Sequence, residues 1–244
     1  ALLSPYGQKT GILADLIAED TSVSGYEAGT VRMKSVWNKH DQTMDFLVKN
    51  EIGGSPTLDA KGSYMPGNGD IRAKINMGGL ELGYVSSFLK SVFSEISGKV
   101  TGEVTLAGSA GKLSVFSRNT SLRDGLLRVA YTDVTYNVDG PFHIDDNGLT
   151  FDSIAVRDRQ EGTGTVTGGI AFRQLKDIRL DTRIRVRDME VLNMTDDGEV
   201  PIYGRVKASG DVGISGPLSS VTMDVDARTS GEGDFHIPLR DNAM

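Results

Sequence analysis

The chain has 244 residues, with 30 glycines, seven prolines, no cysteine and a formal net charge of −7. Its acidic balance argues against a nucleic-acid partner, because binding to a phosphate backbone normally requires a basic face. The absence of cysteine excludes disulfides, thiolate catalysis and zinc fingers, and is typical of an oxidising compartment. Abundant glycine with 38% hydrophobic residues favours an extended or repetitive β architecture.

No stretch approaches the ~20 consecutive apolar residues of a membrane-spanning helix. Residues 1–20 also lack a charged segment followed by an apolar block. Because the chain does not begin with Met, we expect it to be a fragment whose targeting or anchoring segment lies outside it.

The first part of the chain, residues 1–79, is predicted to form β-strands. Apolar and polar residues alternate in short segments, which is the period of a half-buried strand. Gly, Pro and Asn separate these segments, as expected for successive β connections. The strand candidates are residues 30–37, 43–49, 57–64 and 70–77.

Residues 80–97 change the pattern and predict one amphipathic α-helix. Apolar residues recur there every three or four positions, which places them on one stripe of a helix. Ser97 and Gly98 would end it. The stripe consists of Leu82, Val85, Phe88, Leu89, Val92, Phe93 and Ile96. It can pack on the protein's own sheet, or Val85, Phe88, Leu89, Val92 and Phe93 can form a lid over an apolar groove.

Residues 98–244 contain a repeated strand unit. Residues 99–106 (KVTGEVTL) align without gaps with residues 165–172 (TVTGGIAF), and residues 102–108 (GEVTLAG) share their spacing with residues 210–216 (GDVGISG). Three related copies in one chain indicate reuse of one strand unit.

Strand parity assigns the residues of these units to two faces. One face is apolar and carries mid-strand glycines that permit bending or a bulge, so a curved sheet with an apolar concave lining is predicted. Its predicted groove residues are Val100, Val104, Leu106, Val166, Ile170, Phe172, Leu180, Ile184, Val186, Val206, Val212 and Ile214. The other face is polar and includes an arginine row, Arg179, Arg183, Arg185 and Arg187, which is typical of a solvated surface.

No catalytic or metal site is predicted. His40, His143 and His236 are isolated and lack the paired spacing of zinc ligands. Residues 145–148 (DDNG) suit a hairpin turn better than a calcium loop, because the alternating oxygen ligands and the later Glu are missing. We therefore expect a non-enzymatic protein with no cofactor.

From Ile96 onward the sequence resembles the TamB family, specifically its C-terminal domain, which is related to AsmA-like envelope proteins. The resemblance rests on six short segments in a consistent order, and two of them are similar to Bacteroidetes-type versions. These segments are residues 97–102, 192–195, 203–204, 213–218, 226–229 and 235–239.

The resemblance implies an elongated β-taco, a half-pipe sheet with an apolar interior. It implies a periplasmic protein of a Gram-negative bacterium that is anchored in the inner membrane and reaches an outer-membrane TamA-like barrel protein. It further implies roles in phospholipid transport to the outer membrane and in assembly of outer-membrane proteins, with no catalytic residues.

Three functions follow as hypotheses. The first is a conduit that holds phospholipid acyl chains in the apolar groove. The second is a scaffold for assembly of outer-membrane proteins with a TamA-like barrel. The third, and weakest, is a carbohydrate-binding β-protein, for which a single Trp and 7% aromatic residues offer little support.

Overall fold

The computed structural model describes residues 13–90, 92–109, 112–173, 176–196, 198, 202–217 and 219–238. These residues are nearly all in antiparallel strands. The strands are β1 (Leu13–Val23), β2 (Tyr26–Asn38), β3 (Thr43–Ile52), β4 (Ser55–Met65), β5 (Asp70–Glu81), β6 (Phe93–Ser109), β7 (Lys112–Val129), β8 (Thr135–Asp145), β9 (Gly148–Arg157), β10 (Thr163–Arg173), β11 (Lys176–Met194), β12 (Tyr203–Pro217), β13 (Thr222–Thr229) and β14 (Asp234–His236).

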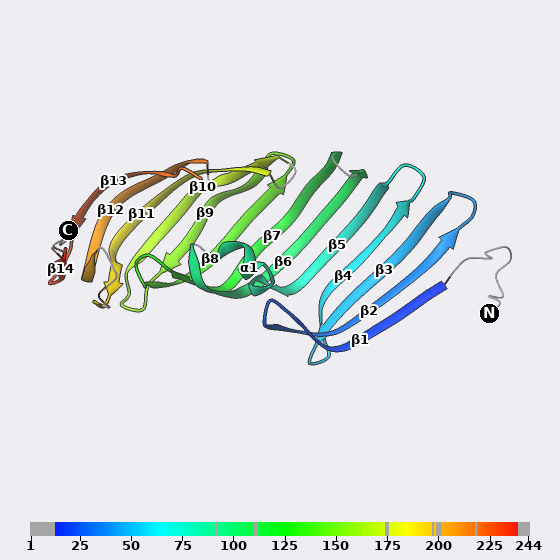
Figure 1. Cartoon of the computed structure of the whole chain (residues 1–244), viewed down its shortest axis with the longest axis horizontal. Coiled ribbons are helices and arrows are strands. Elements are labelled where there is room, and N and C mark those ends of the chain that lie inside the picture. Colours follow the sequence, from blue (N-terminus) through cyan, green and yellow to red (C-terminus); the bar gives the residue numbers. More distant parts are fainter. Residues whose placement is uncertain are drawn as a thin grey trace, which may run out of the picture.

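The strands form one open, curved sheet in which spatial order follows sequence order from β1 to β13. Each strand pairs antiparallel with its sequence neighbours, and β14 pairs with the start of β12. Figure 1 shows the strands side by side along the long axis, with β1 and β13 at opposite ends of the molecule. The prediction of an all-β, curved sheet is confirmed.

Tight turns account for the meander topology. Gly53 and Gly54 join β3 to β4 with φ values of 58° and 80°, and Ser24 and Gly25 join β1 to β2 with φ values of 54° and 86°. Two successive positive φ angles define a type I′ turn, whose twist matches that of the flanking strands. These turns therefore favour immediate return of the chain beside the strand it has just left.

The predicted amphipathic helix over residues 80–97 is wrong. The chain forms only a 3-10 turn, η1 (Leu82–Val85), and one helical turn, α1 (Ser86–Leu89), before β6 begins at Phe93. Phe93 pairs with Val129 and Ile96 pairs with Leu127, and a register shift lies between Phe93 and Glu95. That shift places two apolar residues three positions apart on the same face of a strand, so a bulge reproduced the spacing expected of a helix.

The register assigns every strand an apolar and a polar face, because residues paired across antiparallel strands point to the same side. One apolar row crosses β1 to β6 through Leu16, Met33, Val48, Ala60, Ile75 and Val104. On the opposite side, a polar row crosses β2 to β7 through Arg32, Lys49, Asp59, Asn76, Glu103 and Arg118. The sheet is thus apolar on one side and charged on the other.

The best-buried residues lie at one end of the strands, which we call the closed end. It is the end at which β2 begins and β11 finishes. The buried apolar residues there include Ala28, Ile96, Val134, Met189 and Leu192. At the opposite, open end of the same face, Tyr64 and Leu113 remain 39% and 41% exposed. Burial therefore decreases from the closed end to the open end.

Two long strands produce the closed end by bending across shorter hairpins. In β2, Tyr26 reaches past the β3–β4 hairpin, and its hydroxyl donates to the carbonyl of Ile96 in β6. In β11, the amide of Asn193 reaches past the β9–β10 hairpin and donates to the carbonyl of Thr132 at 2.8 Å. Each bend joins segments that are not neighbours in the sheet.

Candidate functional site

The apolar face of the sheet is the candidate functional site, because it has no second layer of secondary structure over it in the described part of the chain. A second apolar row on this face crosses β9 to β13. It runs through Ile154, Val166, Ile184, Val212 and Val225. Nearer the open end, Leu149, Ile170 and Leu180 form a parallel row across β9, β10 and β11. With the row over β1 to β6, these rows give most of the strands an apolar surface on this face.

The structure places the predicted groove residues on this same face. Val104 and Val186 are buried, at 9% and 7% exposure. The other groove residues are only partly buried: Val100, Leu106, Val166, Ile170, Phe172, Leu180, Ile184, Val206, Val212 and Ile214. Partial burial of so many aliphatic side chains on one face leaves apolar surface available to a ligand.

Sequence reasoning missed the contribution of the first five strands to this face. It placed β2 to β5, gave no segment for β1, and assigned none of the residues of these five strands to the groove. Pairs such as Phe46 with Gly62 and Ala73 with Leu106 show that they continue the same surface. The signal was available in the alternation of β3 and β5, but those strands lack the repeated glycine motif that drew attention to residues 98–244.

The apolar face is concave over β7 to β11. Val138 of β8 packs in one cluster with Ile154 and Val156 of β9 and with Val186 and Met189 of β11. In a flat sheet, β8 and β11 would be about 14 Å apart, because neighbouring strands are ~4.8 Å apart. Their side chains can share one cluster because the sheet curves towards the apolar side.

Tyr136 fixes this curvature with a hydrogen bond across the concave face. Its hydroxyl donates to the carbonyl of Glu190 at 2.9 Å, and so links β8 to β11. Burial raises the pKa of Tyr136 above the ordinary 10.0, and the negative charges of Asp158 and Glu190 add to the rise. The hydroxyl therefore remains protonated, and able to donate, throughout the physiological range.

Asp158 stabilises the closed end of the strands next to Tyr136 and Glu190. Its carboxylate accepts the amides of Gln160 at 2.7 Å, Gly162 at 2.8 Å and Glu190 at 2.5 Å. Asp158 is 5% exposed, so this carboxylate has exchanged water for main-chain donors. Its contacts are those of a structural residue that holds the end of β11 against the β9–β10 hairpin.

The polar face consists of exposed charges and ion pairs. Arg185 pairs with Asp211 at 3.0 Å, and Lys74 pairs with Glu103 at 2.7 Å. All four members of the predicted arginine row are exposed: Arg179, Arg183, Arg185 and Arg187. The charged side chains keep this face in contact with water.

The residues of the predicted lid separate into two groups. Val85, at 43% exposure, and the partly buried Leu89 lie in η1 and α1, whereas the partly buried Phe93 lies in β6. Val92 connects them and donates its amide to the carbonyl of Leu89 at 3.0 Å. The side chain of Phe88 lies outside the described residues. The lid itself stays a prediction.

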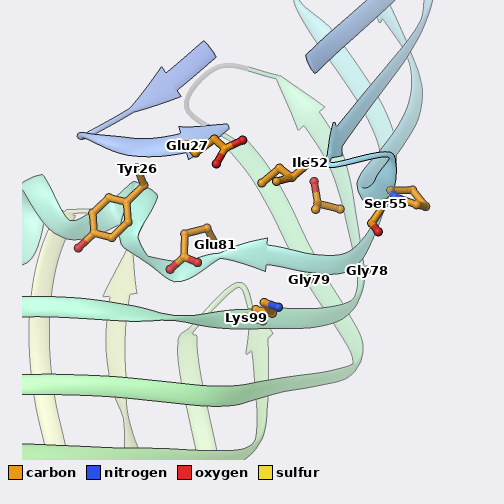
Figure 2. Close-up of a pocket in the computed structure, with 10 residues that line it drawn as sticks. Tyr26, Glu27, Ile52, Ser55, Gly78, Gly79, Glu81 and Lys99 are labelled. Atoms are coloured by element: carbon orange, nitrogen blue, oxygen red, sulfur yellow. The ribbon is translucent and has the colours of Figure 1, made fainter. Parts of the chain in front are cut away.

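A pocket of about 400 Å³ lies at the closed end of the N-terminal half. Figure 2 shows Glu27, Glu81 and Lys99 around it, together with Ile52 of β3. Glu81 accepts the amides of Gly83 at 3.1 Å and Gly98 at 3.0 Å, so one of its carboxylate oxygens supports the chain around η1. The pocket lacks a nucleophile paired with a base.

Two further features bear on the type of protein. Within the described residues, no group of three or more His, Asp or Glu side chains is placed to hold a metal ion. None of the described helices has the length and apolar character needed to cross a membrane.

The fold defines the class of protein: an open antiparallel sheet with one apolar, partly concave face and one charged face. Residues 152–242 match the family model described as the TamB C-terminal domain. The match supports a TamB family assignment for this part of the chain, which begins within β9 and extends past β14. Comparison with curated proteins and with solved structures gave no match.

The family assignment confirms the resemblance seen in the sequence. TamB proteins are a non-enzymatic transport and assembly family of the Gram-negative envelope, associated with outer-membrane assembly machinery. The match to this domain supports a TamB-like envelope protein.

Proposed function

We propose that this chain is a periplasmic segment of a TamB-like protein that holds phospholipid acyl chains against its apolar face. The observation that carries the proposal is the apolar rows over β1 to β6 and over β9 to β13, most of whose side chains remain partly exposed. We refer to this face, in its proposed role, as the groove.

The energetics favour acyl chains as the ligand. Each methylene withdrawn from water gains about 0.8 kcal/mol, and this gain requires no specific polar contact. A surface lined by Val, Ile, Leu and Met offers dispersion and burial without a hydrogen-bonding pattern that would select one headgroup. A non-directional surface of this kind suits cargo that must move along it.

The two ends of the strands suggest how a lipid would lie. At the closed end, Tyr26 and Asn193 tie distant strands together, while Tyr64 and Leu113 leave the open end accessible. A lipid would therefore insert its tails through the open end and keep its headgroup in water there. The segment of residues 82–89 would cover part of the groove as a lid.

Localisation and partners follow from the same proposal. In the intact protein, an inner-membrane anchor outside this fragment would hold one end of the sheet, and a TamA-like outer-membrane barrel would receive the other. The long axis would then cross the periplasm, and phospholipid would move along the groove to the outer membrane.

Adjacent residues of β6 provide the test. Leu106 points to the apolar face and is half-buried, whereas Thr105 points to the polar face and is exposed. We expect Leu106→Asp to abolish co-purification of phospholipid, because a carboxylate opposes burial of acyl chains. Thr105→Asp should retain the wild-type lipid content, measured by native mass spectrometry of the 244-residue chain.

Circular dichroism and urea unfolding of both variants control for loss of the fold. Wild-type chain that carries no phospholipid after purification, and takes up none from vesicles, would contradict the proposal. So would equal lipid content in a folded Leu106→Asp variant and the Thr105→Asp control.

A second function, scaffolding of outer-membrane protein assembly, is favoured by a separate observation. Every residue of β13 is exposed, and its outer edge has no partner strand among the described residues. An unpaired strand edge is a site at which an extended polypeptide can add. The carbohydrate-binding alternative gains no such support, because the single open sheet does not form a closed sandwich.

A further inference from the structure

The C-terminal edge of the sheet has a specific chemical pattern. On the apolar side, four large side chains are more than half exposed along β13, β14 and the residues just after them. They are Met223 at 61%, Val225 at 60%, Phe235 at 55% and Ile237 at 63%. Their neighbours on β12 include Ile214, which pairs with Met223, and Val212, which pairs with Val225. The apolar rows therefore reach this edge without being covered there.

The polar side of the same edge carries two exposed acidic residues, Asp224 and Asp226, with Arg228 on the same side at the end of β13. Asp226 pairs in register with Asp211, and Asp211 already forms an ion pair with Arg185 on the next strand. Like charges directly opposite each other on a sheet are destabilising. Asp224 lies on the same side, opposite Gly213, which has no side chain. In the described structure, no ion pair forms at Asp224 or Asp226.

We propose that the edge of β13 binds an extended polypeptide strand in which apolar residues alternate with Lys or Arg. Its main chain would pair with the free edge of β13, and its apolar side chains would cover Met223 and Val225. Its basic side chains would lie beside Asp224 and Asp226 and neutralise the acidic pair. This inference rests on the proposed function, since the added strand would extend the groove beyond this chain.

The opposite edge of the sheet differs in its pattern. On β1, Leu16 and Ile17 are 60% and 54% exposed, and as successive residues they point to opposite faces. Asp15 on that edge is already paired with Lys34 at 3.2 Å. On β13 apolar residues alternate with the acidic residues Asp224 and Asp226, whereas on β1 the successive apolar residues Leu16 and Ile17 break such an alternation.

The test measures binding of fluorescent peptides to the 244-residue chain by anisotropy. The first peptide alternates Val with Lys over the eight-residue length of β13, and the second alternates Val with Glu. We expect the Val/Lys peptide to bind at least about tenfold more tightly, because it places opposite charges beside Asp224 and Asp226. A Val/Lys peptide with N-methylated amides on one edge should lose binding, since it cannot complete the strand ladder.

Charge reversal provides the matched variants. Asp224→Lys combined with Asp226→Lys should invert the preference towards the Val/Glu peptide, whereas Glu19→Lys on β1 should leave the wild-type preference unchanged. Equal binding of both peptides, or full binding of the N-methylated peptide, would overturn the inference. Concentration-dependent dimerisation that the Val/Lys peptide does not displace would also overturn it, because the edge would then accept a second copy of the chain.

Lipid content separates this inference from the proposed function. The Asp224→Lys, Asp226→Lys variant should keep its phospholipid, because both residues lie on the polar side. If the wild-type chain carries phospholipid but binds the two peptides equally well, the strand-addition inference alone is overturned. Failure of wild-type chain to carry lipid, with normal peptide selectivity, would contradict the groove alone.

Discussion

The hydroxyl of Tyr136 links β8 to β11 across two intervening strands, and its removal has a defined consequence. Tyr136→Phe leaves the buried carbonyl of Glu190 without this donor, so we expect a loss of about 1 kcal/mol in the free energy of unfolding at neutral pH. Urea unfolding measures this loss. Tyr131→Phe is the control, because Tyr131 is 69% exposed.

The same tyrosine gives a pH dependence with a definite sign. Because burial raises its folded-state pKa above 10.0, the protonated hydroxyl stabilises the fold fully below pH 10.0. That contribution is lost as pH rises from 10.0 towards the folded-state pKa. Wild-type chain should therefore lose stability more steeply than Tyr136→Phe over this alkaline range. Urea unfolding at several alkaline pH values measures this difference. If the free energy of unfolding falls equally with pH in the wild-type chain and in Tyr136→Phe, the hydroxyl of Tyr136 is not buried in this way.

At the level of single residues, the sequence predicted to which face of the sheet a side chain points. It did not predict which distant residue that side chain contacts. Parity correctly placed Val166, Ile184 and Val212 on one side, because side chains alternate along any strand. It offered no means of pairing Tyr136 with Glu190, which are far apart in the chain and meet only because the sheet curves.

Glycines with positive φ lie within the curved strands, and one of them, in β10, can be tested by substitution. Gly168 has a φ of 106°, and a β-carbon there would collide with the carbonyl oxygen of Asp181 on β11. We expect Gly168→Ala to destabilise the fold by about 2 kcal/mol. Gly67→Ala, in a turn with open space around it, should change little. Thermal unfolding compares the Gly168→Ala and Gly67→Ala variants. Equal unfolding midpoints would rule out strain at residue 168.

Element prediction succeeded for strands and failed at residues 80–97 for a physical reason. Four predicted segments correspond to β2, β3, β4 and β5, with the observed strands longer at both ends or at one. The helix failed because pairing of Phe93 and Ile96 with β7 outweighed a local periodicity that bulges can imitate. A local sequence pattern carries no information about the partner strand. Here pairing with β7 determined that residues 93–97 form a strand.

At the scale of the molecule, stability should be unevenly distributed along the sheet. The buried cluster of Val138, Ile154, Val156, Val186 and Met189 lies in β8 to β11, while β1 and β13 each have one neighbouring strand among the described residues. Hydrogen exchange should therefore be slowest in β8 to β11 and fastest in β1 and β13. Uniform protection across all strands would contradict this gradient.

The strand order, in which each new strand lies beside the one synthesised before it, has a consequence for biogenesis. Pairing between sequence neighbours closes only short loops, so no segment must wait for a distant part of the chain. A chain emerging from a narrow export channel can therefore build its sheet from one end, one hairpin after another. At any moment two strand edges are exposed to misassociation, that of β1 and that of the newest strand.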